Sequence, residues 1–107
     1  MALPWVVKRL TSDNAKAIGL GDRGMLRPGL KADINVIDYD KLKIHGPHVV
    51  YDLPAGGKRL MQRTDGYAAT VLAGTVVHRH GQPTGATPGR LVRGARSGPE
   101  PFRQAAE

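Results

Sequence analysis

The chain has 107 residues and a net charge of +7, from 16 Lys and Arg against 9 Asp and Glu. This length suits one small domain and is far below the roughly 250 residues of a (β/α)8 barrel, so the chain cannot contain a whole barrel of that kind. The absence of cysteine excludes disulfides, thiolate zinc sites and cysteine nucleophiles, and no stretch reaches the roughly 18 apolar residues of a membrane span, so we expect a cytoplasmic protein without a membrane partner.

A helical segment is expected over residues 4–19. Pro4 suits a first helical turn because its missing N–H would have no partner there. The run 11–13, Thr-Ser-Asp, interrupts the apolar stripe, and each of these residue types can cap a helix. Two short helices with a break at 11–13 are therefore predicted. Gly19 and Gly21 would end the second helix.

Extended segments are expected after a turn at Pro28-Gly29. They cover residues 31–38, 48–51, 58–63, 67–73 and 75–79. The last two segments are joined by Ala73-Gly74, and Gly supplies the positive φ that a tight hairpin turn requires. With 14 Gly and 8 Pro, short strands are favoured over long helices. The fold class is therefore mainly β with a short N-terminal helical segment.

The last part of the chain differs in composition from the rest. Gly, Pro, Arg, Ser and Ala dominate beyond residue 80, and apolar residues become sparse. Residues 94–107 are expected to be a disordered tail.

Four histidines are candidate metal ligands. His78 and His80 would share one face of a strand, and His45 and His48 flank Pro47 on a loop. No third ligand lies near the first pair in sequence, so solvent-exposed histidines at a strand end and in a polar loop are the favoured interpretation. A small metal-binding protein that uses all four remains a weaker alternative.

Other catalytic patterns are incomplete. Asp38 and Asp40 are two apart at a strand end, where they favour a turn over acid–base chemistry. Ser12 and Ser97 lack the Gly-x-Ser-x-Gly context of a nucleophile. The glycine-rich run 19–24 follows a helix and not a strand, so it does not predict a dinucleotide site. No catalytic, cofactor-binding or metal-binding residue is therefore assigned.

The run 52–60, Asp-Leu-Pro-Ala-Gly-Gly-Lys-Arg-Leu, is a second distinctive element. Lys58 and Arg59 could bind an anion beside the Ala-Gly-Gly turn, but a tight connection before the next strand is the favoured interpretation. Nucleic-acid binding is not favoured, because the sequence shows neither a basic run nor interleaved aromatic residues.

A family resemblance is carried by Leu10-Thr11, Ala15, Gly19-Leu20, Asp22-Arg23-Gly24, Arg27-Pro28-Gly29 and the runs 32–38, 52–59, 66–67, 71–74 and 84–90. In the order of these elements, the chain resembles the C-terminal part of an N-acyl-D-amino-acid deacylase (D-aminoacylase) of the amidohydrolase superfamily. The resemblance covers roughly residues 5–93. The Pro-Gly-x-x-Ala-Asp part is shared by many amidohydrolases. The Asp-Leu-Pro-Ala-Gly-Gly element, together with the late Thr-Gly-Ala-x-Pro-Gly-Arg, narrows the resemblance to the deacylases.

This resemblance implies a zinc-bearing barrel elsewhere in the parent enzyme, with hydrolysis of an N-acyl amide by a metal-activated water. It implies that residues 1–20 correspond to the last barrel helix and residues 21–93 to a partial β-sandwich like the composite domain of metal-dependent hydrolases. The barrel motifs have no counterpart in this sequence. The chain is therefore expected to be an inactive, non-catalytic C-terminal module that holds no cofactor.

Such a sandwich would leave a sheet edge and an apolar face open. The expected partners are the missing barrel and N-terminal strands, in cis or in trans, or a second copy bound through the open edge. The alternative function is a free-standing, small, basic β-rich module that binds an anionic partner.

Overall fold

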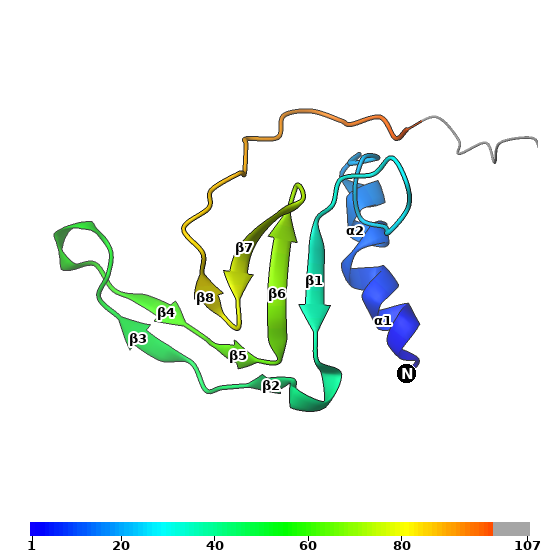
Figure 1. Cartoon of the computed structure of the whole chain (residues 1–107). Coiled ribbons are helices and arrows are strands. Elements are labelled where there is room, and N and C mark those ends of the chain that lie inside the picture. Colours follow the sequence, from blue (N-terminus) through cyan, green and yellow to red (C-terminus); the bar gives the residue numbers. More distant parts are fainter. Residues whose placement is uncertain (100–107) are drawn as a thin grey trace, which may run out of the picture. The chain divides into compact units, whose positions relative to one another are not determined.

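The computed structural model describes residues 1–99 (Figure 1). The chain divides into two compact units, and each is described by itself. Among the described residues, the first contains Met1–Asp33, Leu72–Thr75 and 88–99, and the second contains Ile34–Val71 and Val76–Thr87. The elements in chain order are α1 (Leu3–Leu10), α2 (Ser12–Ala17), β1 (Ile34–Ile37), the 3-10 helix η1 (Tyr39–Lys41), β2 (Lys43–Ile44), β3 (His48–Val50), the 3-10 helix η2 (Pro54–Gly56), β4 (Arg59–Met61), β5 (Thr64–Asp65), β6 (Tyr67–Leu72), β7 (Thr75–Arg79) and β8 (Gln82–Pro83).

Two short helices begin the first unit, as the sequence predicts. Pro4 lies in the first turn of α1, and the break falls at Thr11, whose φ of −122° and ψ of −86° are not helical. The Thr11 hydroxyl donates a 2.7 Å hydrogen bond to the carbonyl of Val7, which satisfies one of the free carbonyls at the end of α1. Gly19 follows α2 with a φ of +77°, a conformation that costs glycine little.

The segment after α2 is joined to a distant part of the chain. The Gly21 N–H donates to the carbonyl of Arg96, and the Arg96 N–H donates to the carbonyl of Gly19, each at 2.7 Å. Arg96 lies within the tail predicted at 94–107 and is ordered by these two bonds. Residues 100–107 of that tail are outside the described residues, so the disorder of the tail as a whole stays a prediction.

The second unit carries most of a four-stranded sheet in the order β1-β6-β7-β8. β1 pairs antiparallel with β6, with Ile34 opposite Val71 and Val36 opposite Ala69. Residues 73 and 74 connect β6 to β7 with φ values of +49° and +82°, which is the type I′ geometry of a two-residue hairpin. The predicted hairpin is confirmed.

The segment 43–65 forms a two-stranded arm from two antiparallel pairs (Figure 1). β2 pairs with β5, and β3 pairs with β4, with Val49 opposite Leu60. Between the two pairs, the His45 N–H donates to the carbonyl of Arg63 at 2.9 Å. The sequence predicts strands near 48–51 and 58–63, and the arm shows that these segments are paired with each other.

The fold is mainly β, with antiparallel sheets and a short N-terminal helical segment, as predicted, and residues 1–99 form no barrel. Within those residues only Ala15 is buried, and large apolar side chains such as Val36, Leu60 and Leu91 are about half exposed or more. No helix among the described residues is long and apolar enough to cross a lipid bilayer. The described units therefore present much of their apolar surface to solvent.

Candidate functional site

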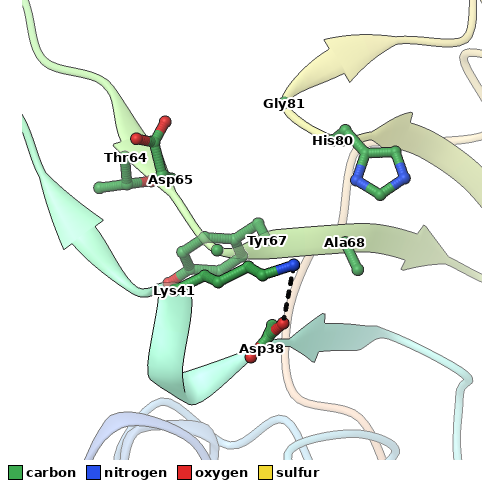
Figure 2. Close-up of a pocket in the computed structure, with 9 residues that line it drawn as sticks. Asp38, Lys41, Thr64, Asp65, Tyr67, Ala68, His80 and Gly81 are labelled. Carbon is green, nitrogen blue, oxygen red and sulfur yellow. Dashed lines mark ion pairs between the residues drawn. The ribbon is translucent and has the colours of Figure 1, made fainter.

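A hollow of about 230 Å³ lies in the second unit, where η1, the start of β6 and the turn after β7 meet (Figure 2). Its polar side chains are Asp38, Lys41, Thr64, Asp65, Tyr67 and His80, and Gly66, Ala68 and Gly81 complete the lining. Two backbone hydrogen bonds fix its walls, from the Asp38 N–H to the Gly66 carbonyl at 2.8 Å and from the His80 N–H to the Ala68 carbonyl at 3.0 Å.

Each carboxylate of this hollow has a basic side chain beside it. The Lys41 ammonium lies 3.6 Å from the Asp38 carboxylate, and the His45 imidazole lies 2.8 Å from the Asp65 carboxylate. These side chains are between 43% and 79% exposed, so solvent weakens both interactions. Because both carboxylates are exposed and have partners, neither is a buried charged group that would bind a ligand tightly.

The structure separates the histidines that the sequence singles out. His45 faces Asp65, His48 begins β3, and His78 lies on β7. His80 lies after β7, in a turn with a φ of +48°, so the expectation that it shares a strand face with His78 is wrong. No group of three or more His, Asp or Glu side chains suited to a metal ion occurs in residues 1–99.

The predicted acidic and basic candidates have structural partners. Asp38 precedes η1, as expected for a turn, and its carboxylate pairs with Lys41; Asp40 lies within η1. Arg59 donates its Nε–H to the Asp52 carboxylate at 2.7 Å, and this hydrogen bond lowers the pKa of Asp52. The Arg59 guanidinium is already paired with Asp52. This pairing favours the interpretation of the turn at 52–58 as a tight connection before the next strand.

A second hollow, of about 350 Å³, lies in the first unit, and the sequence does not predict it. It is lined by Asp22, Arg23, Lys31, Leu72, Ala73, Pro88, Gly89, Arg90, Leu91, Val92 and Arg96. The family resemblance is the signal in the sequence that marks this region, since Asp22-Arg23, Leu72-Ala73 and the run 84–90 all carry part of it.

Arg23 organises the acidic side of this second hollow. Its Nε–H and one Nη–H donate to the two carboxylate oxygens of Asp22 at 3.0 and 3.2 Å, and its other Nη lies 3.6 Å from the Asp33 carboxylate. The hydrogen bond from Arg23 is the main reason that the pKa of Asp22 lies below its usual range. Asp33 also accepts the Ala73 N–H at 2.9 Å.

Comparison with protein families gives one match. The model of the amidohydrolase family matches residues 2–78, more than two thirds of the chain. The chain belongs to the amidohydrolase family. No curated protein and no solved structure matches it. Within this family, the deacylase branch indicated by the Asp-Leu-Pro-Ala-Gly-Gly element is taken up below as a proposal.

Proposed function

We propose that this chain is a non-catalytic C-terminal β-sandwich module of an N-acyl-D-amino-acid deacylase-like amidohydrolase. The parent enzyme would hydrolyse an N-acyl amide bond with zinc held in its barrel. The donors present in residues 1–99 do not fit a zinc site, because no three of their His, Asp and Glu side chains lie together. We therefore assign this chain no chemical step, and its role is to cover and stabilise the barrel.

The open edge of the four-stranded sheet is the observation that supports this proposal. β1 and β8 are the two edge strands. β8 is only two residues long and contains Pro83, which has no N–H to donate, so pairing at that edge is poor. β1 has the sequence Ile-Asn-Val-Ile, with neither charge nor proline, and it is suited to pairing with a further strand. The N-terminal sandwich strands of the parent enzyme would pair here.

Exposed apolar side chains on the second unit also support docking. Val36 and Ile37 on β1 are 50% and 43% exposed, and Val49 and Leu60 on the arm are 49% and 67% exposed. Val49 and Leu60 are directly opposite each other in the β3–β4 register and therefore share one face. Apolar surface of this kind on paired strands is typical of a surface that a partner covers.

The proposal is tested by complementation. A D-amino-acid deacylase of this family, expressed without its C-terminal module, is mixed with this chain and assayed for zinc-dependent release of acetate from an N-acetyl-D-amino acid. We expect no activity from this chain alone and recovered activity from the mixture. Activity of the isolated chain, or no stable complex and no recovery, would contradict the proposal.

A matched pair of variants on the arm tests the docking face. Leu60→Asp places a charge on the apolar face, and we expect it to weaken complex formation by at least 10-fold. Arg63→Asp changes an exposed residue outside the β3–β4 pair and makes a larger change in net charge. It should leave complex formation within about 2-fold. Co-elution on size-exclusion chromatography and the far-ultraviolet circular dichroism of each variant provide the measurements.

A further inference from the structure

Hydrogen bonds between segments of the chain hold the walls of the hollow in the first unit. The Lys31 N–H donates to the Asp22 carbonyl at 2.8 Å, which closes the loop between them. Asp33 accepts the Ala73 N–H at 2.9 Å and so fixes the hairpin tip beside the start of β1. The bonds of Arg96 to Gly19 and Gly21 anchor the third wall. All three walls belong to the same compact unit.

This hollow carries a surplus of positive charge. Its lining includes four cationic residues, Arg23, Lys31, Arg90 and Arg96, and one acidic residue, Asp22. Arg23 is paired with Asp22 and with nearby Asp33, so both carboxylates are already neutralised in part. Lys31, Arg90 and Arg96 form no ion pair with any of residues 1–99.

The remaining lining is apolar. Leu72, Leu91 and Val92 contribute to it, and Leu91 is 73% exposed. The segment around Gly89 packs against Leu72, because a Cβ placed on Gly89 would lie 3.3 Å from the Leu72 Cδ2. A volume of about 350 Å³ is within the range of roughly 300–1,000 Å³ typical of small-molecule sites.

We propose that this hollow binds the phosphate group of a small phosphorylated molecule, with Lys31, Arg90 and Arg96 as its cationic ligands. A phosphate monoester carries close to two negative charges near neutral pH, which matches the surplus better than a single carboxylate does. Guanidinium groups donate paired hydrogen bonds to phosphate oxygens, and a lysine adds a point charge. The apolar residues would contact the organic part of the ligand. This site goes beyond the proposed scaffold role and does not depend on it.

The test measures binding of inorganic phosphate to the 107-residue chain. Amide chemical shifts and calorimetry are recorded at constant ionic strength, with acetate as the carboxylate comparison. We expect saturable phosphate binding that shifts the amides of Lys31, Ala73 and Arg96, and acetate binding at least 10-fold weaker. Absence of saturation at about 10 mM phosphate, or equal binding of acetate, would overturn the proposal.

Charge-matched variants separate a built site from general attraction to a basic protein. Arg90→Gln should weaken phosphate binding by at least 10-fold. Arg63→Gln removes one positive charge from an exposed position on the arm and should change binding by less than 2-fold. Lys31→Gln serves as the second site variant if Arg90→Gln does not fold. If Arg63→Gln weakened phosphate binding as much as Arg90→Gln, the phosphate proposal would be overturned. Failure of the complementation assay would contradict only the proposed role as a deacylase module and would leave the phosphate proposal unaffected.

Discussion

The two hollows contain similar kinds of side chain but differ in charge balance. In the second unit, Asp38 and Asp65 are each paired with one basic side chain, and all four groups are well exposed. In the first unit, one partly buried guanidinium, Arg23, is shared by two carboxylates. The other basic residues of that hollow therefore keep their charge unpaired within residues 1–99.

This difference indicates that a count of polar residues is a poor guide to a ligand site. Exposed ion pairs in a shallow hollow compete with water and contribute little free energy. In other hollows, the lining side chains have an excess of one charge and backbone hydrogen bonds hold them around apolar residues. A ligand of the opposite charge then binds with a more favourable free energy.

The largest expected effect is on the wall of the hollow in the second unit. Gly66 has a φ of +100°, and a Cβ there would lie 2.7 Å from Leu42 Cα. Gly66→Ala should lower the free energy of unfolding by about 3 kcal/mol, through backbone strain and the clash. Gly89→Ala, on the wall of the hollow in the first unit, meets only the flexible Leu72 side chain and should cost less than about 1 kcal/mol. Urea unfolding of both variants checks this, and equal losses would contradict it.

The next largest effect is expected for the basic residue that pairs with a carboxylate in each hollow, Arg23 in the first unit and Lys41 in the second. Arg23 is 19% exposed and serves two carboxylates, so Arg23→Gln should destabilise the chain by about 1–2 kcal/mol. Lys41 is 79% exposed, and Lys41→Gln should cost less than about 0.5 kcal/mol. Thermal unfolding at low and high salt measures both. A larger loss of stability for Lys41→Gln than for Arg23→Gln would contradict this difference between the two hollows.

Acid should affect the hollow in the first unit through Asp22. The hydrogen bond from Arg23 lowers the pKa of Asp22 below its usual value near 3.8, so the folded state binds this proton less readily than the unfolded state. The resulting stability is complete above the unfolded pKa and is lost as the pH falls through the folded pKa. Asp22→Asn should therefore flatten the loss of stability between pH 5 and pH 3.

The comparison variant for this pH series is Arg23→Gln, which removes the donor of the hydrogen bond that lowers the pKa of Asp22. Its stability profile should flatten in the same way as that of Asp22→Asn. Chemical unfolding at several pH values provides both curves, and an unchanged slope for Asp22→Asn would refute the assignment.

The smallest effects concern the two type I′ turns, one beside each hollow. Ala73 and His80 occupy the first turn position with φ values of +49° and +48°, and each is followed by glycine. Asn-Gly is the preferred pair in this turn. Because alanine tolerates positive φ less well than histidine, Ala73→Asn should stabilise the chain by about 0.5–1 kcal/mol and His80→Asn by less than about 0.5 kcal/mol. Differential scanning calorimetry can rank the two.

Local elements were predictable because their signals lie close together in sequence. The helix break at Thr11 and the hairpin turn at Ala73-Gly74 follow from capping residues and from glycine at one position. The strand at 31–38 is predicted three residues too long at its start, since Lys31 and Asp33 are held by loop hydrogen bonds to Asp22 and Ala73. His80 is misplaced for the same kind of reason, because the β7–β8 turn takes it off the strand.

The sequence by itself determined the two short helices, the longer strands, the mainly β class and the family resemblance. The helices and strands depend on residue spacing within a few positions, and the resemblance depends on the order of short motifs along the chain. Only the tertiary structure decided which charges are neutralised and which remain available, because Arg23, Lys31, Arg90 and Arg96 come from distant segments of a chain whose basic residues form no run. Electrostatic interactions depend on distance in space, and backbone pairing between remote segments sets that distance.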